Sequence, residues 1–454
     1  MSGASTPLGG RSGRSTPLHL RDVVHEVVRH FRNEKDSEAH RIFRNSAGHK
    51  PKVANNVLLP QTVNPDEETV PGIDTLEAPV IPLPEDSLEY APTTGVKALR
   101  EAVAAMYNAE YRQDKLSQYT FENVCIVPGG RSGLSRVAAV VGDVYCSYQV
   151  PDYTAYDQVL SAFRRLVPVP TALDAENKYR LDVNQIKKDI RTQGLEVIEG
   201  EELEELVHVC RDASATLIMD EFYSWYMYPE DEAELGKTVS SAQYVDNVNS
   251  DPVVIVNGLT KNWRLPGWRV CWVLGPKNLI TALSQAGSFL DGGANHPLQL
   301  AAIPLLDLER IRLEKLALQK HFKAKRDHVL KRLDELGLHV AVPPQATFYI
   351  WLNLEQLPAP LNNGLTFFEE LLKEKTIVIP GIFFDINPAH RRNLFHSSCH
   401  HFVRLSFGPP LADLDKGLDA IGRVLKKARR EGGHAFGHSY KKSIEGVHQL
   451  DKHV

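Results

Sequence analysis

The chain has 454 residues, with 52 Lys and Arg against 57 Asp and Glu, so its formal net charge at pH 7 is -5. No excess of positive charge is available to neutralise phosphates, which argues against a nucleic-acid partner. Hydrophobic residues make up 43% of the chain and charged residues 24%, a balance typical of globular proteins. No apolar run reaches the roughly 18–20 residues of a membrane-spanning helix, so we expect no membrane partner.

The cysteines do not form a disulfide framework. There are five, an odd number, and no two are spaced as Cys-x-x-Cys. A reducing compartment, the cytoplasm, is the simplest interpretation.

The two ends of the chain are compositionally different from the rest. Residues 1–20 are rich in Ser, Gly and Pro and contain no acid, which predicts a disordered arm. This composition also resembles a transit peptide, although the apolar face such peptides carry is weak here. The polar tail 432–454 is expected to be poorly ordered.

The first expected elements are helices. Apolar residues at near-helical spacing predict a helix over 22–34. The many prolines of the stretch 51–90 predict an extended segment. A second helix is expected over 95–111, because Leu99, Val103 and Met106 fall on one face.

Short apolar runs then alternate with amphipathic helices. Continuous β-branched runs of this length are typical of parallel strands covered on both faces, which predicts an α/β fold with a mostly parallel central sheet. From about residue 300 a long helical pattern precedes three short strands, which predicts a smaller α+β domain. The expected strands of the first part are 124–127, 143–150, 216–219, 253–256 and 270–274, and those of the second lie within 348–354, 376–381 and 403–407.

Polar segments follow four of these strands. They are Gly-rich at 128–133, aromatic at 151–156, acidic at 220–223, and basic at 257–264. Each has a simpler explanation as a turn, a cap or solvated surface. Open α/β sheets bind ligands at the carboxyl ends of their strands, so together the four segments predict one crevice that holds a phosphate, stacks a ring, pairs a cation and supplies an amine.

Three segments carry a resemblance to a known family. NGLTKNWRLPGWR at 257–269, Asp220-Glu221-Phe222-Tyr223 upstream and Arg404-Leu405-Ser406-Phe407 downstream resemble the class I/II aminotransferases, enzymes of fold type I that depend on pyridoxal 5′-phosphate. The resemblance covers roughly residues 85–425. It implies a large cofactor-binding domain (91–300), a small C-terminal domain (301–431) and an N-terminal segment (21–90) that packs on the small domain.

The resemblance implies roles for residues around the cofactor ring. Lys261 matches the lysine that forms the internal aldimine, since only a primary amine can condense with the cofactor aldehyde and then relay a proton. Asp220 matches the acid that pairs the pyridinium nitrogen. Tyr223 matches the tyrosine that hydrogen-bonds the phenolic oxygen, and Tyr153 matches the aromatic ring that stacks on the cofactor.

The resemblance also implies residues for the phosphate and the substrate. Arg269 matches the arginine that clamps the phosphate, with a helix-start loop of amides beside it. Arg404 matches the arginine that grips the substrate carboxylate; a surface ion pair is the simpler reading. The loop residues are Gly130, Arg131 and Ser132, and Tyr90 matches a tyrosine that reaches the phosphate from the second subunit of a homodimer.

Two departures from the family pattern stand out. Gly258 occupies a position where the family often has Ser or Thr touching the phosphate, and Thr260 next to the lysine remains a candidate cofactor contact. Between Tyr153 and Asp220 there is no Asn-Pro-x-x-Pro-Thr-Gly-type segment, whose asparagine would hydrogen-bond the phenolic oxygen. We therefore expect a strand and a loop to be missing near Gly194–Val197, through a genuine deletion or an artefact of gene prediction.

The resemblance predicts an aminotransferase that moves an amino group between an amino acid and a 2-oxo acid. The alternatives are a lyase or synthase with the same cofactor, and a catalytically impaired paralogue that lacks the asparagine segment. No Lys or Arg occurs between Lys277 and Arg310, where dicarboxylate-selective members carry a basic group, so neutral or aromatic substrates are favoured.

No metal site is expected. His396, His400 and His401 surround Cys399, but their spacing does not fit a tetrahedral zinc site. His434 and His438 lie in the polar tail.

Overall fold

The computed structural model describes residues 56–58, 80–82, 89–163, 165–193, 195–198 and 203–431. The expected arm at 1–20, the helix expected over 22–34 and the tail 432–454 lie outside the described residues. Within the described ranges, no helix is both long enough and apolar enough to cross a bilayer.

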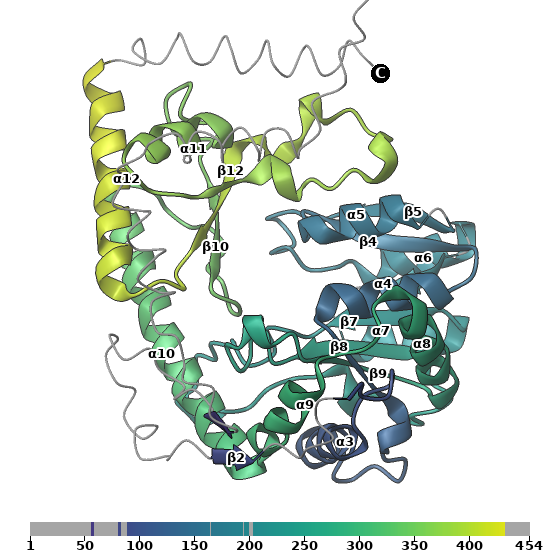
Figure 1. The fold of residues 1–454 in the computed structure, drawn as a ribbon. Coiled ribbons are helices and arrows are strands. Elements are labelled where there is room, and N and C mark those ends of the chain that lie inside the picture. Colours follow the sequence, from purple (N-terminus) through teal and green to yellow (C-terminus); the bar gives the residue numbers. More distant parts are fainter. Residues whose placement is uncertain are drawn as a thin grey trace, which may run out of the picture. The chain divides into compact units, whose positions relative to one another are not determined.

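The central sheet has seven strands in the order β3-β9-β8-β7-β6-β4-β5 (Figure 1). β9 runs antiparallel to β3 and β8, and the other pairs are parallel. This confirms the predicted α/β class with its mostly parallel sheet. The strands are β3 (Val124–Val127), β4 (Val144–Val150), β5 (Leu166–Ala172), β6 (Leu195–Ile198), β7 (Thr216–Asp220), β8 (Val253–Gly258) and β9 (Cys271–Leu274).

The middle strands are buried along their whole length. Every residue of β3, β8 and β9 is buried, as their continuous apolar sequences predicted. Helices α4 (Gly130–Val140) and α8 (Lys277–Leu290) contact each other and β3, and α4 also contacts β8 and β9. On helix α3 (Lys97–Tyr111) the predicted face of Leu99, Val103 and Met106 is buried.

Two strands of this sheet were not expected. β5 contains Pro168 and Pro170, which lack backbone N–H donors, and it lies at the edge of the sheet, where one side of a strand needs no donors. β6 is the second, and it corrects the expectation of a missing strand. Val197 pairs with Cys146 of β4 and with Thr216 of β7, so the sheet is continuous at this point.

The other part of that expectation, a missing Asn-Pro-x-x-Pro-Thr-Gly loop, stays a prediction from the sequence. Four residues, Glu199 to Glu202, join β6 to α7 (Leu203–Ala213), and none of them is Asn or Pro. β6 also ends opposite Leu217, three residues before Asp220. Beyond Ile198, therefore, no strand pairs with both β4 and β7 among the described residues.

A second sheet of three antiparallel strands, in the order β10-β12-β11, follows the long helix α10 (Leu308–Glu335). Its strands are β10 (Tyr349–Asn353), β11 (Ile379–Pro380) and β12 (Phe402–Ser406), at the three predicted places. The domain boundaries themselves stay a prediction. The remaining helices are α5 (Thr154–Ala162), α6 (Val183–Gln193), α9 (His296–Ala302), α11 (Gly364–Lys373) and α12 (Leu411–Glu431), and β1 (Asn56–Leu58) pairs with β2 (Val80–Pro82).

Candidate active site

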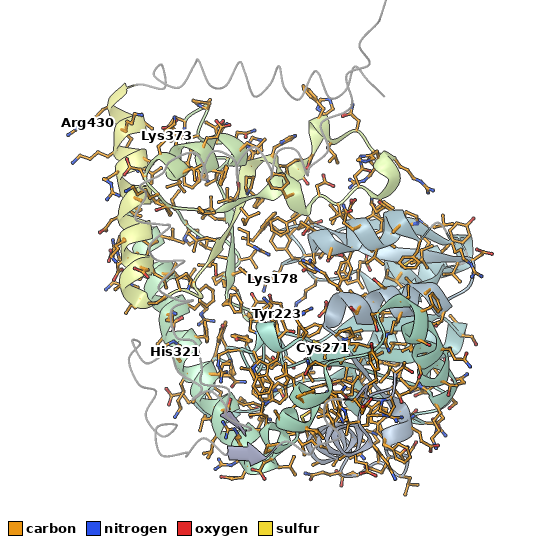
Figure 2. The ribbon with its side chains drawn as sticks, viewed as in Figure 1. Lys178, Tyr223, Cys271, His321, Lys373 and Arg430 are labelled. Carbon is orange, nitrogen blue, oxygen red and sulfur yellow. The ribbon has the colours of Figure 1, made fainter. Side chains whose placement is uncertain are left out.

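The Gly-rich and basic segments that follow β3 and β8 meet at one edge of the central sheet, the edge formed by the carboxyl ends of its parallel strands. Gly258 at the end of β8 pairs with Cys271 at the start of β9. The Cys271 thiol lies 3.2 Å from the hydroxyl of Thr260 and accepts a hydrogen bond from the backbone N–H of Gly130. Tyr223 and Cys271, both labelled in Figure 2, mark this edge.

Asp220 ends β7 at this edge and is held by two donors. The hydroxyl of Tyr156 donates to Oδ2 at 2.7 Å, and the backbone N–H of Phe222 donates to Oδ1 at 3.3 Å. Burial raises the pKa of Asp220, and these two donors and the charge of Lys261 oppose that shift. A cation placed beside this carboxylate would therefore relieve an unfavourable desolvation.

Lys261 lies in the turn after β8, and its amine is enclosed by aromatic rings. Nζ is 5.5 Å from the ring centroid of Tyr223 and 5.6 Å from that of Phe348. The backbone carbonyl of Lys261 accepts hydrogen bonds from the Tyr226 hydroxyl at 2.9 Å and from the N–H of Arg264 at 3.0 Å. These bonds fix the backbone, while the side chain reaches the ring of Tyr223.

Two buried asparagines support the same turn. The Asn262 amide donates to Oδ1 of Asn257 at 3.2 Å, and its own Oδ1 accepts from the N–H of Trp225 at 3.2 Å. Asn257 is the last residue but one of β8 and Trp225 follows β7, so the two amides join neighbouring strands near their ends. The lysine turn is thereby held against the acidic segment.

Gly129 and Arg269 form an anion cradle at the start of α4. Gly129 has φ +102°, and a Cβ atom there would lie 1.6 Å from Nη2 of Arg269, so the guanidinium occupies the place of a side chain. Nη1 of Arg269 donates to the carbonyl of Pro266 at 3.0 Å, and no carboxylate of the described residues forms an ion pair with this arginine. A guanidinium with no acidic partner beside a helix N-terminus suits a phosphate group.

Ser132 and Gly130 complete this loop. The Ser132 hydroxyl donates to the Pro128 carbonyl at 3.5 Å. A Cβ atom at Gly130 would lie 2.5 Å from the ring of Phe222, so only glycine lets the helix begin this close to the acidic segment. The loop is therefore packed between Arg269 and the segment after β7.

Tyr153, at the N-cap of α5, is 39% exposed. Its ring meets that of Tyr156 edge to face, with centroids 5.7 Å apart. Its hydroxyl accepts hydrogen bonds from Nη2 of Arg131 at 2.8 Å and from Nε at 3.2 Å. Tyr153 is thus connected to Asp220 through Tyr156, whose ring contacts Tyr153 and whose hydroxyl bonds the carboxylate.

Arg404 lies on β12 of the second sheet, between two aromatic rings. Its guanidinium carbon is 4.0 Å from the centroid of Tyr349 and 4.7 Å from that of Phe384. The hydroxyl of Tyr349 lies 3.4 Å from that of Tyr223, which connects Arg404 to the lysine pocket. Within the described part of the chain, Arg404 forms no ion pair with a carboxylate. The alternative interpretation of Arg404 as half of a surface ion pair therefore finds no acidic partner there.

The structure explains the departure at Gly258. A Cβ atom at this position would lie 2.5 Å from the Cα atom of Cys271, so β8 and β9 approach too closely for a serine or threonine. The Thr260 hydroxyl bonds the Cys271 thiol. Thr260 is therefore near the cradle but already has one partner.

Tyr90 is not brought to this site within one chain. Its side chain is 92% exposed, and the neighbouring Glu89 carbonyl contacts the His296 ring at 3.0 Å. Phe289, at 76% exposure, lies near the end of α8, and Gly293 in the turn after that helix packs against residues 91–93. Tyr90 and Phe289 are therefore both large side chains that the single chain leaves exposed.

Several site residues had no specific signal in the sequence. Tyr156 could have been found from its Tyr-x-x-Tyr spacing with Tyr153 at the start of a helix. Phe348 and Tyr349 stood within a predicted strand, and nothing marked them apart from core aromatics. Phe384 is held by a contact far along the chain, since its carbonyl accepts a hydrogen bond from the N–H of Asp152 at 2.9 Å.

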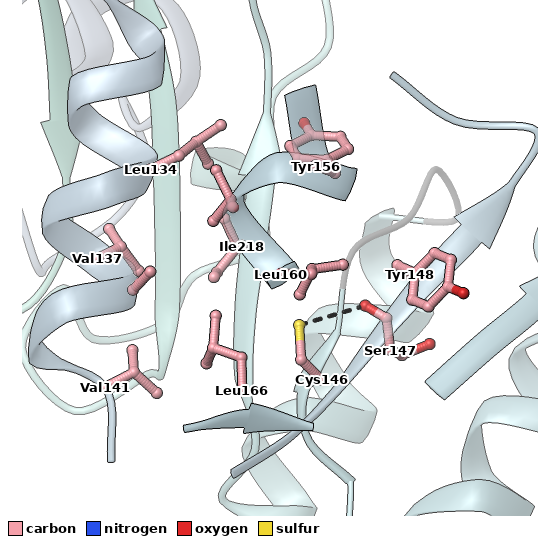
Figure 3. Close-up of a pocket in the computed structure, with 12 residues that line it drawn as sticks. Leu134, Val137, Val141, Cys146, Ser147, Tyr148, Tyr156, Leu160, Leu166 and Ile218 are labelled. Atoms are coloured by element: carbon pink, nitrogen blue, oxygen red, sulfur yellow. Dashed lines mark hydrogen bonds between the residues drawn. The ribbon is translucent and has the colours of Figure 1, made fainter. Parts of the chain in front are cut away.

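An apolar cavity of about 50 Å³ lies behind Tyr156 (Figure 3). Its walls come from α4, α5, β4, β5 and β7, including Ile218 and Leu160. Cys146 to Tyr148 of β4 and Ile218 of β7 flank the place where β6 has ended. The cavity thus lies between helices α4 and α5 and the strands β4 and β7.

The histidines near Cys399 contact backbone carbonyls. His400 Nε2 lies 2.9 Å from the Leu394 carbonyl and His401 Nδ1 lies 2.6 Å from that of Asn362, so the two rings turn to different backbone groups. Over the described ranges, no three His, Cys, Asp or Glu side chains gather as a metal site. His434 and His438 lie outside those ranges.

An amine beside aromatic rings, a partly buried carboxylate, an anion cradle and a separate guanidinium fit pyridoxal phosphate, which has an aldehyde, a basic ring nitrogen and a phosphate. The fold and the site together define the class of enzymes that use this cofactor on an α/β sheet of fold type I. The chain belongs to the aminotransferase class I and II family, whose model matches residues 76–421. The predictions of fold type, of pyridoxal phosphate as cofactor and of an aminotransferase are confirmed.

Individual relatives and solved structures agree with this assignment. The chain is 24% identical over 366 residues to a probable aspartate/prephenate aminotransferase of Aquifex aeolicus, covering 77% of this chain and 87% of the relative. It is 27% identical to the glutamate-pyruvate aminotransferase AlaC of Escherichia coli, covering 72% and 80%. The fold is similar to an aromatic aminotransferase from Pyrococcus horikoshii, with TM-score 0.63, 21% identity, and coverage of 76% and 91%.

Proposed function

We propose that Lys261 is the residue that holds the cofactor and moves the α-proton of the amino acid substrate. When bound, pyridoxal phosphate supplies an aldehyde carbon that accepts amines and a ring that withdraws electrons from the substrate Cα. The Lys261 amine acts as a general base and takes the proton from the substrate Cα. The observation that carries this proposal is the Lys261 amine in the Tyr223 and Phe348 pocket, beside Asp220.

Asp220 and Tyr223 hold the ring in this proposal. Asp220 keeps the ring nitrogen protonated, because a charged carboxylate stabilises a neighbouring cation. Tyr156 keeps that carboxylate oriented, since its hydroxyl donates at 2.7 Å. Tyr223 donates to the phenolic oxygen, and Tyr153 covers one face of the ring.

The cradle after β3 holds the phosphate. Arg269 supplies the charge, and the loop of Gly130, Arg131 and Ser132 lies at the positive end of α4, with the backbone N–H of Arg131 as its donor. The N–H groups of Gly130 and Ser132 donate to the Cys271 thiol and to the Gly129 carbonyl in this structure, so they hold the loop in place. Thr260 adds a hydroxyl from the lysine turn. The support is the guanidinium that lies against Gly129 without an acidic partner among the described residues.

Arg404 binds the α-carboxylate of the substrate. The rings of Tyr349 and Phe384 lie within 4.0 and 4.7 Å of its guanidinium and leave its N–H edges for a planar, bidentate partner. The aromatic lining and the absence of Lys and Arg between Lys277 and Arg310 favour substrates with neutral or aromatic side chains. The enzyme would act in amino acid metabolism, as in a biosynthetic transamination.

The active form is a homodimer in this proposal, and Tyr90 reaches the phosphate of the second subunit. The support is that Tyr90 and Phe289 are large apolar side chains exposed at 92% and 76% in the single chain, and a second subunit would remove such surface from water. All five cysteines are free, which is consistent with a reducing compartment such as the cytoplasm.

Borohydride reduction of the protein mixed with pyridoxal phosphate, followed by peptide mapping, tests the proposal. We expect a pyridoxyl label on the peptide with Lys261 and its loss in Lys261→Ala. Lys237→Ala is the matched control, since Lys237 is an exposed lysine paired with Glu234 at 2.7 Å. A label that survives Lys261→Ala at another lysine would refute the proposed role.

A further inference from the structure

Arg131 has its side chain on the ring of Tyr153. Nη2 and Nε of the guanidinium both donate to the Tyr153 hydroxyl, at 2.8 and 3.2 Å, and the guanidinium carbon is 5.8 Å from the ring centroid. No described carboxylate forms an ion pair with Arg131. The two hydrogen bonds to one phenol are therefore the polar contacts that orient this charged side chain.

Tyr153 is held from its other side by a chain of contacts that starts at the carboxylate. Asp220 accepts from Tyr156 at 2.7 Å, and Tyr156 meets the Tyr153 ring at an interplanar angle of 88°. The backbone of Tyr153 is tied down as well, because its N–H donates to the Asp152 carboxylate at 2.6 Å. The ring angle is thus set by Tyr156 on one side and by Arg131 at the hydroxyl.

We infer that Arg131 is a positioning residue, which acts through Tyr153 and fixes the angle of the ring that covers the cofactor. This inference rests on the proposed function, in which Tyr153 stacks on the cofactor. The backbone N–H of Arg131 belongs to the phosphate loop whatever the side chain is. The contribution of the guanidinium can therefore be separated from that of the loop by substitution.

The physical basis is the freedom of an exposed tyrosine. With 39% of its surface exposed, an unanchored Tyr153 ring would rotate about two side-chain torsions. Ordering it would then oppose cofactor binding, because lost rotamer freedom lowers affinity. The two hydrogen bonds share one acceptor oxygen, and one hydrogen bond of ordinary net strength corresponds to about a 3- to 10-fold change in an equilibrium constant.

A double-mutant cycle with pyridoxal phosphate as the probe tests the inference. The dissociation constant and the visible circular dichroism of the bound cofactor are measured for the wild type, Arg131→Gln, Arg131→Lys, Tyr153→Phe and Arg131→Gln/Tyr153→Phe. We expect Arg131→Gln to weaken binding about 3- to 10-fold and to change the circular dichroism. In the Tyr153→Phe background the same change should have an effect below about 2-fold, because the acceptor is gone.

Arg131→Lys should lie between the wild type and Arg131→Gln, since an ammonium can still donate to the phenol. Arg423→Gln is the matched control; this exposed arginine on α12 pairs with Glu374. An equal loss in both backgrounds, or no loss in either, would overturn the inference. If the wild type bound no pyridoxal phosphate, the proposed function would fail with it, whereas binding without coupling removes this inference alone.

Discussion

Tyr156 donates a hydrogen bond of 2.7 Å to the carboxylate of Asp220, from the first turn of α5 to the end of β7. The two residues are 64 positions apart in the chain. This bond replaces part of the hydration that Asp220 loses on burial.

Tyr156→Phe should therefore weaken cofactor binding. A hydrogen bond to a charged group contributes about 1.5–3 kcal/mol, which predicts a loss of roughly 10-fold or more in pyridoxal phosphate affinity. Equilibrium dialysis or absorbance titration measures it. Tyr111→Phe is the control, because its hydroxyl bonds Thr238 at 2.7 Å instead of the carboxylate. Equal losses in the two variants would show that any buried hydroxyl matters and would contradict a specific role of Tyr156.

The affinity for pyridoxal phosphate should also depend on pH through Asp220. Because burial raises the pKa of this carboxyl, it is protonated at pH values where an ordinary aspartate is charged. Only the charged form pairs with a cation, so affinity should fall as the pH drops through the raised pKa and level off above it. Titrations over a pH series should show this limb in the wild type and not in Asp220→Asn. The same limb in both proteins would assign it to another group.

Arg404→Lys should affect the substrate and leave the cofactor in place. An ammonium keeps the charge but loses the planar fork that binds a carboxylate bidentately. We expect kcat/KM for the amino acid to fall by about 100-fold, corresponding to one or two charged hydrogen bonds, with pyridoxal phosphate affinity changed less than about 2-fold. Steady-state kinetics and cofactor titration measure the two quantities. A parallel loss of both would place Arg404 outside the substrate site.

Gly258→Ser should destabilise the protein even though it restores the residue the family often has. The new Cβ would lie 2.5 Å from a backbone atom of Cys271, so β8 and β9 must separate. Overpacking of this kind costs about 1–3 kcal/mol in the free energy of unfolding, measurable by urea denaturation. Gly142→Ser is the control, since nothing lies within 4 Å of a Cβ atom there. An unchanged stability of Gly258→Ser would mean that the two strands separate freely.

Leu160→Ala should enlarge the cavity behind Tyr156. Leu160 is buried and lines that cavity, so its truncation removes apolar contacts and leaves a larger void. Such changes cost about 2–5 kcal/mol in the free energy of unfolding. Leu116→Ala, at a fully exposed leucine, should stay within about 0.5 kcal/mol. Similar results for the two leucines would indicate that the cavity collapses around the shorter side chain.

The sequence by itself determined five of the seven strands of the central sheet, the α/β class and the polar segments that follow four of those strands. Periodicity and continuous β-branched runs carry this information because burial on one or both faces selects residue types locally. The strands at 124–127 and 253–256 are therefore seen where they were predicted. The resemblance placed Lys261, Asp220 and Arg404 because their spacing from neighbouring motif residues is specific.

Only the tertiary structure decided where β5 and β6 lie, which residues support the carboxylate, and why Gly258 is a glycine. β5 carries prolines that a sequence pattern excludes from strands, yet an edge position tolerates them, and in β6 Glu196 interrupts the short apolar run. Tyr156, Tyr349 and Phe384 reach the site across 64 or more positions of the chain, through pairings such as Tyr156 to Asp220 and Tyr223 to Tyr349. Such contacts depend on how strands and loops are brought together in space, and no local rule of residue spacing contains them.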